Sequence, residues 1–310
     1  MVTPSVGTDG VATRELLRRL ELDVTMRLDG MLHGDYRGLV PGHGSEPGET
    51  RLYQAGDDVR RIDWNVTART QETHVRETIA DRELSTQICV DLSPSLDFGT
   101  TDREKRDVVL EATAAVGLLT SRIGNRVGAV LVDADGQRTV PPGQGRTHLL
   151  SLLQRVADTP RGASGSGDLA AGLHRIGTHA RRRGLVVVIS DFLAPPGWEI
   201  PLRRLTTRHE VLAIEILDPR ELELPDVGLV TLTDPETGEV REIATGNAKL
   251  RRRYAEAAAA QRAGIAAELR RAGADHLQLR TDRDWLLDLA TFVARRRKRR
   301  GVPRPAAARS

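Results

Sequence analysis

The sequence predicts an α/β fold in which a largely parallel β-sheet is covered by helices on both faces. Short apolar and β-branched runs at 86–90, 127–132, 185–189 and 210–217 alternate with longer segments of helical periodicity. The run 185–189 is apolar throughout, as expected of a strand buried on both faces of a parallel sheet. The length of 310 residues, with 39% hydrophobic and 29% charged residues, suits a globular chain of one large domain with an added segment.

The first part of the chain predicts a helix, an irregular stretch and one strand. Residues 1–10 have the composition of a disordered terminus. Leucine and valine recur at helical spacing from Thr13 to Leu28, which indicates one buried stripe. The Gly-rich stretch 29–50 contains His33 and His43, but no third ligand stands at a useful spacing for a metal site. Alternating polarity over 72–84 predicts a strand that runs towards the central one.

The remainder of the chain predicts alternating strands and helices. Capping residues, glycines and the apolar periodicity set their expected limits. In order we expect a strand at 86–90, a helix from Thr101 or Asp102 to Ile123, a strand at 126–133 with a hairpin edge at 137–140, helices at 147–157 and 169–182, a strand at 185–189, a short helix at 202–206, a strand at 210–217, a β-hairpin at 226–243, a helix at 247–271, a strand at 276–279 and a last helix capped by Asp282.

Polar side chains follow two of the predicted strands. The first strand ends in Asp91-x-Ser93-x-Ser95, and Pro94 prevents the strand from continuing. Asp191 ends the strand at 185–189. One carboxylate and two hydroxyls on alternate loop residues are hard oxygen ligands of the kind that Mg²⁺ prefers. Ser, Pro and Asp are also ordinary turn residues, so a purely structural turn is the alternative.

A charged segment precedes the first of these strands. It contains Asp57, Asp58, Arg60, Arg61, Asp63, Trp64 and Arg69 among apolar Val59 and Ile62. Alternating charges around apolar residues predict a segment pinned by ion pairs and anchored by the Trp64 indole. We interpret it as a structural buttress beneath the sheet; a recognition surface for a partner is the alternative.

The order of these features resembles two known families. The strand followed by Asp91-x-Ser93-x-Ser95, a helix, a Ser/Gly loop and the strand-end Asp191 resembles a von Willebrand factor A-type domain. The block Arg51-x-Tyr53-x-x-Gly56-Asp57-Asp58-Val59-Arg60-Arg61-Ile62-Asp63-Trp64, with Ala68-Arg69-Thr70 and Val75-Arg76-Glu77 after it, is similar to the signature of domain-of-unknown-function family 58. Members of that bacterial family carry such a block before an A-type domain.

The resemblance implies a fold, a site and a partner. It implies a Rossmann-like von Willebrand factor A-type sheet flanked by helices over 85–293, after a disordered 1–10 and an N-terminal helix and irregular β segment over 11–84. It implies a metal-ion-dependent adhesion site for Mg²⁺ (or Mn²⁺) at Asp91, Ser93, Ser95 and Asp191, with Ser166 or Ser164 where the family usually has Thr. It also implies a non-enzymatic, chaperone-like adaptor for a MoxR-type AAA+ ATPase, with a membrane von Willebrand factor A protein as a further expected partner.

Composition bears on the remaining function classes. The single cysteine, Cys89, permits no internal disulfide and fits a reducing, cytoplasmic setting. No signal peptide or membrane span is expected. Residues 294–310 contain eight Lys and Arg residues and no acid, whereas the whole chain has a net charge of only +3. The rest of the chain is therefore mildly acidic, and the tail is expected to be basic and disordered. Two alternative functions remain. One is an Mg²⁺-dependent phosphoester hydrolase that uses Asp91, Asp97 and Asp191, and the other is a nucleic-acid binder that uses the tail and the arginines of 251–253. Because only 3% of the residues are aromatic, nucleic acid is the less expected partner.

Overall fold

The computed structural model describes residues 9–32, 50–54, 59, 62–76, 85–121, 124–162, 165–234 and 237–299. Contacts divide the chain into one unit of residues 1–40 and 84–310 and a second of residues 41–83. We describe each unit by itself. The first helix, α1 (Asp9–Leu32), belongs to the larger unit, because Leu17, Val24 and Leu28 pack into the core of the sheet domain. The predicted boundary at 84/85 therefore separates the sheet from the signature segment but not from α1.

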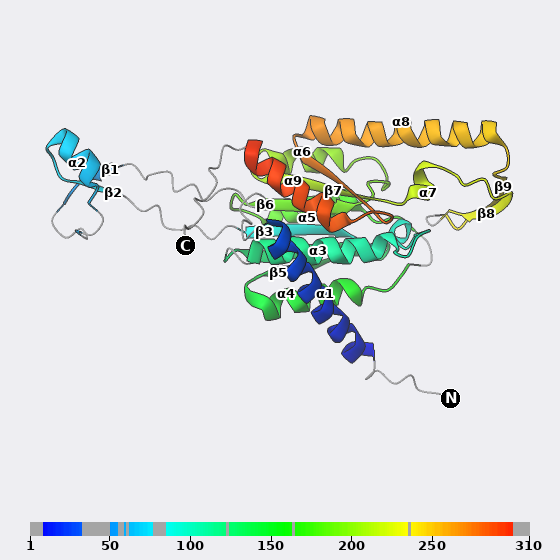
Figure 1. Cartoon of the computed structure of the whole chain (residues 1–310), viewed down its shortest axis with the longest axis horizontal. Helices are drawn as coiled ribbons and strands as arrows, with labels where there is room; N and C mark the ends of the chain where they lie inside the picture. Colours follow the sequence, from blue (N-terminus) through cyan, green and yellow to red (C-terminus); the bar gives the residue numbers. More distant parts are fainter. Residues whose placement is uncertain are drawn as a thin grey trace. The chain divides into compact units, whose positions relative to one another are not determined.

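A six-stranded sheet forms the centre of the larger unit (Figure 1). Its spatial order is β10-β7-β6-β3-β4-β5, and every neighbouring pair is parallel except β4 and β5. The strands are β3 (Ser85–Asp91), β4 (Arg126–Asp133), β5 (Gly136–Gly143), β6 (Leu185–Ser190), β7 (Glu210–Leu217) and β10 (Asp275–Arg280). This mixed α/β sheet with one antiparallel edge confirms the predicted fold class.

The strand order creates a switch point between two central strands. From β3 the chain proceeds outward to β4 and β5, then returns to the other side of β3 for β6, β7 and β10. The order is that of a doubly wound sheet, in which the crevice for a ligand opens at the carboxyl ends of the two strands where the winding reverses. In this chain those strands are β3 and β6, which end at Asp91 and Ser190.

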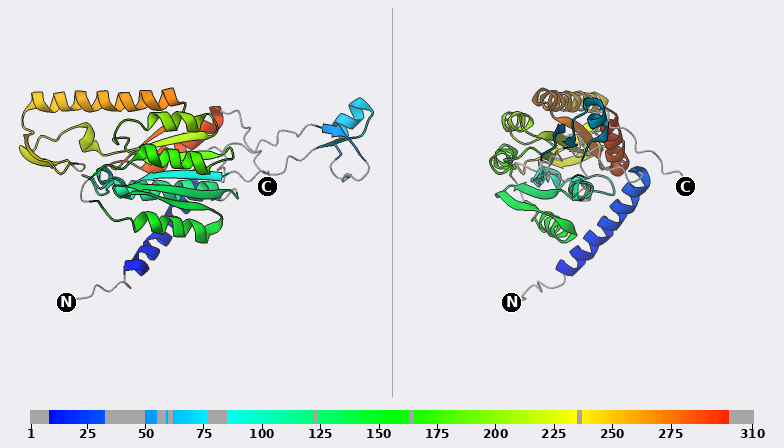
Figure 2. Two further views of the ribbon diagram at one scale, coloured as in Figure 1. Left: turned by 180° about the vertical axis from the view of Figure 1, so that it is seen from behind. Right: turned by 90° about the vertical axis from the view of Figure 1, so that its left-hand side faces the viewer.

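Helices cover both faces of the sheet (Figure 2). One hydrophobic core joins α1, α3 (Lys105–Ser121), α4 (Gly145–Ala157) and α9 (Trp285–Arg299) to one face. A second core joins α5 (Leu169–His179), α6 (Glu199–Thr206) and α8 (Ala248–Ala272) to the other. Successive residues of β3 serve opposite faces: Ile88 and Val90 lie in the first core and Cys89 in the second.

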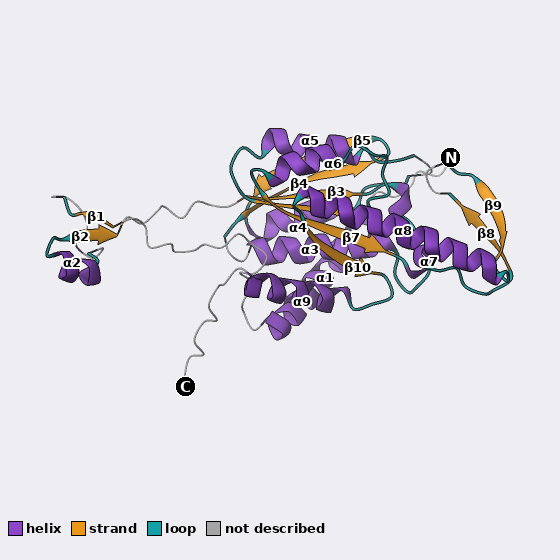
Figure 3. Ribbon diagram, turned by 90° about the horizontal axis from the view of Figure 1, so that it is seen from above, coloured by secondary structure: helices purple, strands orange, loops and turns teal. Residues whose placement is uncertain are grey.

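Three small elements connect β7 to α8 (Figure 3). The short helix α7 (Pro219–Leu222) begins with a capping box. The Asp218 side chain accepts a hydrogen bond from the backbone N–H of Glu221, and the Glu221 side chain accepts one from the backbone N–H of Asp218. The two-stranded ribbon β8 (Leu229–Thr233) and β9 (Val240–Ala244) confirms the predicted hairpin. No helix in the described part of the chain is long and apolar enough to cross a membrane.

Several element limits differ from those predicted. The helix expected from Thr101 or Asp102 begins at Lys105, and Asp284 rather than Asp282 accepts the first-turn N–H of the last helix, from Leu287. That helix continues to Arg299, so the first residues of the predicted disordered tail are helical. Arg296 explains the extension: it is buried and pairs with Asp275 at 2.8 Å and Glu210 at 3.3 Å. Residues 1–8 and 300–310 lie outside the described part.

The smaller unit contains β1 (Thr50–Leu52), β2 (His74–Arg76) and α2 (Trp64–Thr70). Only 74–76 of the strand predicted at 72–84 is described as strand. Asp63 is the N-cap of α2, and its carboxylate accepts the backbone N–H bonds of Asn65 and Val66.

The prediction that the Trp64 indole is a buried anchor of the signature segment is wrong for the smaller unit. Trp64 follows the cap at the first position of α2 and is 69% exposed, and Val59 is 60% exposed. Arg69 is exposed as well. Asp57, Asp58, Arg60 and Arg61 lie outside the described residues, as do His33 and His43. In this unit the described part of the signature supplies a helix cap rather than a buried aromatic anchor.

Candidate functional site

The end of β3 places the first predicted ligand inside the protein. Asp91 is 1% exposed, and its Oδ1 accepts the backbone N–H of Ser93 at 3.0 Å. This bond turns the chain sharply after the strand, and Pro94 begins a 3₁₀ turn that runs to Leu96. The turn brings the Ser93 and Ser95 hydroxyl oxygens to 3.1 Å from each other. The motif Asp91-x-Ser93-x-Ser95 is thus folded as a compact loop.

The end of β6 supplies the second aspartate. Ser190 donates its hydroxyl to Asp91 Oδ2 at 2.6 Å, which ties the two strand ends together. Asp191 follows and is fully buried; its Oδ1 accepts the backbone N–H of Leu193 at 3.0 Å. Phe192 adopts a positive φ of 56°, a conformation that non-glycine residues rarely take. Packing of its ring on Trp198, with centroids 5.2 Å apart, holds this turn.

The structure brings the predicted ligands together. Ser95 donates a side-chain hydrogen bond to Asp191, so the loop after β3 reaches across to β6. Ser166 is half-buried, and its neighbour Gly167 packs on the site: a Cβ at Gly167 would come 3.3 Å from Asp91 Oδ1. A glycine at this position allows the loop that carries Ser166 to approach the Asp91 carboxylate. Ser164 lies outside the described residues.

A buried lysine, which the sequence did not predict, completes the site. Lys105, at the start of α3, has no exposed surface, and its Nζ lies 2.8 Å from Asp191 Oδ2 and 2.5 Å from Glu221 Oε1. Glu221 comes from α7, so three separate elements meet at one ammonium group. Asp191 therefore already has a cationic partner within the chain.

An arginine extends this network to the helix layer. Arg262 of α8 donates to the carbonyl oxygen of Asp191 at 2.9 Å, to Glu215 at 3.2 Å and to Glu221 at 3.3 Å. Glu215, on β7, also bonds to His276 and to Gln278, each at 2.8 Å. The fold places these charges in contact, so the Glu215 and Glu221 carboxylates both have cationic partners, and Glu215 has an amide partner as well.

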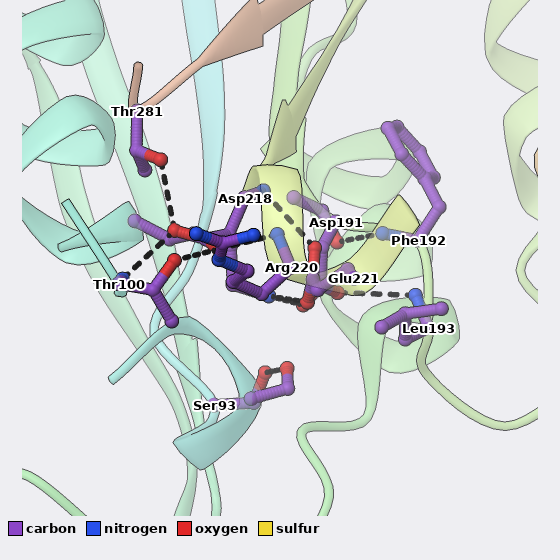
Figure 4. A network of polar contacts seen from close by, with 12 residues as sticks. Ser93, Thr100, Asp191, Phe192, Leu193, Asp218, Arg220, Glu221 and Thr281 are labelled. Atoms are coloured by element: carbon purple, nitrogen blue, oxygen red, sulfur yellow. Dashed lines mark hydrogen bonds and ion pairs between the residues drawn. The ribbon is translucent and has the colours of Figure 1, made fainter. Parts of the chain in front are cut away.

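A neighbouring aspartate fixes the loop between the first turn and α3 (Figure 4). Asp218 accepts the Thr100 hydroxyl at 2.6 Å and the Thr281 hydroxyl at 2.9 Å, and it also accepts the Arg220 backbone N–H. Figure 4 shows Asp218 and Glu221 close to Asp191, with Ser93 on the other side of the group. These bonds hold the segment that ends at Lys105 against the ends of β7 and β10.

The two aspartates differ in protonation behaviour. Burial raises the pKa of Asp91 to about 6, the nearby Asp191 charge adds to the increase, and the bonds from Ser190 and Ser93 offset only a part of it. Burial also opposes ionisation of Asp191, but the Lys105 charge and its hydrogen bond outweigh that effect and lower the pKa of Asp191. The same attraction to Asp191 and Glu221 outweighs burial at Lys105 and raises its pKa.

The donor set suits a hard, well-hydrated cation at Asp91. A divalent cation such as Mg²⁺ is held by one or two carboxylates together with hydroxyls and water. Asp91, Ser93 and Ser95 supply two hydroxyls and one carboxylate that no cationic side chain of the described residues contacts, whereas Asp191 shares its charge with Lys105. No group of three or more His, Cys, Asp or Glu among the described residues could hold a metal, so a site here depends on the serines and on water.

Residues of the alternative functions are engaged elsewhere. Asp97, expected to help a hydrolase hold a cation, forms an ion pair with Arg106 at 2.8 Å. Arg251 pairs with Asp226 at 3.0 Å and Arg252 with Glu256 at 3.7 Å. The structure therefore does not bring Asp97 into the cluster of Asp91 and Asp191, and it leaves fewer free charges on α8 for nucleic acid.

Two solved structures show a low similarity to this chain. The sheet order and the two strand-end aspartates define a doubly wound α/β protein with a polar site at the switch point. An aerotolerance-related membrane protein from Bacteroides fragilis is similar, with a TM-score of 0.46 and 13% identity over 70% of this chain and 99% of that chain. The VWA domain of SpRpn10 has a TM-score of 0.38 and 14% identity over 66% of this chain and 93% of that domain. Values this low say nothing about a shared function.

The sequence comparisons show the family. Residues 49–264 match the family described as "Protein of unknown function DUF58", and the chain belongs to that family, as its signature predicts. Uncharacterized proteins of Mycobacterium bovis and Mycobacterium tuberculosis are 55% identical over 283 residues, which cover 91% of this chain and 89% of theirs.

Proposed function

We propose that this protein is a non-enzymatic interaction module that captures an acidic side chain of a partner protein through a divalent cation. Asp91, Ser93 and Ser95 would hold the cation, Mg²⁺ or Mn²⁺, and Ser166 and Asp191 would contribute from the neighbouring loop and strand. When bound, the cation supplies a Lewis-acidic position that accepts a carboxylate oxygen.

One observation carries this proposal. Asp91 is buried, and its partners are a backbone N–H and a serine hydroxyl, with no cationic side chain in contact in the described part of the chain. A buried carboxylate without a cation is unfavourable, and its neighbour Asp191 adds repulsion. A divalent cation at Asp91 would remove both penalties, whereas Lys105 already does so for Asp191.

The residues around the site support binding rather than catalysis. A hydrolase needs a group that activates water or a nucleophile. The described groups in contact with Asp91 and Asp191 are serines, backbone amides, Lys105 and Arg262, and both cations are already held in ion pairs. We therefore assign the site to recognition.

The family suggests the partner. We propose that a MoxR-type AAA+ ATPase presents the acidic side chain and that a membrane von Willebrand factor A protein is a further member of the complex. The assembly would act in the cytoplasm in protein maturation or complex assembly.

A pull-down with the purified ATPase tests this proposal. Mg²⁺ stays present throughout, because the ATPase needs it for its own nucleotide. We expect the wild type and the Asp102→Ala control, which removes an exposed acid near α3, to retain the ATPase. We expect Asp91→Ala to lose it while keeping its circular-dichroism spectrum. Retention of the ATPase by a folded Asp91→Ala variant would refute the proposal.

A further inference from the structure

A cavity between α5 and α6 lies apart from the strand-end site. It has a volume of about 210 Å³ and is lined by Leu173, His174, Gly177, Thr178, Pro201, Arg204, Leu205, Arg208 and His209. The lining residues belong to α5, to α6 and to the turn between α6 and β7. Because the ends of both helices precede strands, the cavity opens at the amino edge of the sheet, opposite to Asp91 and Asp191.

The lining combines an apolar floor with a basic rim. Leu173 and Leu205 are buried, and Pro201 is half-buried. His174, Arg204 and Arg208 are exposed at the rim. His209 is 7% exposed and donates a hydrogen bond to the carbonyl oxygen of Ala180. None of the described residues that line this cavity is acidic, so its electrostatic potential favours an anion.

The arginines at this edge have no carboxylate partner. Within the described part of the chain, no ion pair involves Arg204 or Arg208, and the same holds for Arg203 of α6 and for Arg181, Arg182 and Arg183 of the loop between α5 and β6. Several arginines elsewhere do have carboxylate partners: Arg27 pairs with Asp284, Arg241 with Glu239, Arg280 with Asp282, and Arg138 with Asp133.

The cavity with its basic rim offers a place for an external anion. Unpaired like charges gathered at one edge repel each other, and a bound anion relieves this repulsion. Guanidinium groups bind phosphate oxygens through paired, charge-assisted hydrogen bonds. The volume of about 210 Å³ and the leucine floor favour a small ligand with an apolar part.

We propose that the α5–α6 cavity binds a small organic phosphate monoester. Arg204 and Arg208 hold the phosphate, His174 and the Thr178 hydroxyl lie within the same rim, and the organic part packs on Leu173, Leu205 and Pro201. The site is independent of the metal at Asp91, because the two lie at opposite edges of the sheet.

Calorimetric titration of phenyl phosphate into the full chain tests this site. The double variant Arg204→Gln/Arg208→Gln removes the two rim charges, and Arg252→Gln/Arg253→Gln removes the same charge from α8. We expect the rim variant to weaken phenyl phosphate binding by about tenfold or more, as loss of charge-assisted bonds predicts. The α8 variant should bind as the wild type does.

Four results would overturn the proposal. Absence of phenyl phosphate binding to the wild type would exclude the site. Equal loss of affinity in both double variants would assign binding to the general surface charge. If inorganic phosphate bound as tightly as phenyl phosphate, the apolar floor would have no part in binding. If duplex DNA displaced phenyl phosphate with a steep salt dependence, the ligand would be a polyanion instead.

Discussion

The ends of β3 and β6 make a controlled comparison within one molecule. Asp91 and Asp191 are both buried, follow adjacent parallel strands, and each accept a backbone N–H bond from the residue two positions on. Lys105 contacts Asp191, whereas no cationic side chain among the described residues contacts Asp91. The difference teaches that strand position sets where a carboxylate lies, while a residue from another element decides whether its charge is already balanced.

The same contrast recurs at two glutamates. Glu215 is buried on β7, and Arg262 and His276 contact it at 3.2 and 2.8 Å. Glu111 of α3 pairs with Arg103 at a longer distance of 3.4 Å. Burial raises the pKa of Glu111 to about 7, because the Arg103 charge offsets only a part of the penalty. The protein thus contains balanced and unbalanced buried acids, and their responses to mutation and pH should differ.

The largest effect is expected from removing the buried lysine. Lys105→Met leaves Asp191 and Glu221 without their shared ammonium group, and loss of one partner of a buried ion pair lowers the free energy of unfolding by about 3–5 kcal/mol. Urea denaturation measures the change. Adding Asp191→Asn to Lys105→Met should restore a part of the stability. A loss below about 1 kcal/mol in the single variant would contradict the balance assigned to Lys105.

A smaller effect is expected from the pH response of Glu111. Its folded pKa lies above the unfolded value, so its contribution to stability is fully present below about pH 4.5 and is lost as the pH rises through about 7. The free energy of unfolding should fall by about 3 kcal/mol over this range through Glu111 alone. Glu111→Gln should remove that component, and Glu256→Gln, an exposed acid of α8, should not. Identical pH profiles of Glu111→Gln and wild type would exclude the assignment.

The smallest effect separates the two aspartates directly. Without divalent cations, Asp191→Asn should lower the free energy of unfolding by about 2 kcal/mol, because Lys105 loses one of its two partners. Asp91→Asn should change it by less than about 1 kcal/mol, since the lost hydrogen bonds are offset by the lost repulsion from Asp191. Thermal unfolding of both variants in chelator measures the difference. Equal losses would mean that the two carboxylates are not distinct.

Local signals explain which parts of the site could be predicted. Asp91 and Asp191 each end an apolar β-branched run, so sequence alone places both at one edge of a parallel sheet. The approach of Ser166 follows from a glycine next to it. Lys105 could not be found in this way, because it lies 86 residues from Asp191 and 116 from Glu221. A lysine at the start of a helix looks like a solvated charge until the fold buries it.

The signature segment shows the opposite error. Apolar residues spaced among charges at 59–64 predict a buried indole, but Trp64 is exposed at the first position of α2. The helix cap at Asp63 was the signal to use instead, because an aspartate before a short helix accepts its first N–H groups. Element order in 85–293 was predictable except for the short helix α7 (Pro219–Leu222), which was not predicted from the sequence. Helix starts shifted by a few residues where capping residues compete, as at Thr101, Asp102 and Asp282.

Calorimetric titration of Mg²⁺ and Mn²⁺ tests the central claim about Asp91 most directly. The wild type, Asp91→Ala and the Asp102→Ala control are compared at the same pH and salt. We predict that the wild type and Asp102→Ala bind one cation and that Asp91→Ala binds none, while all three unfold cooperatively. Absence of binding to the wild type, or equal binding to Asp91→Ala, would contradict a divalent-cation site at the end of β3.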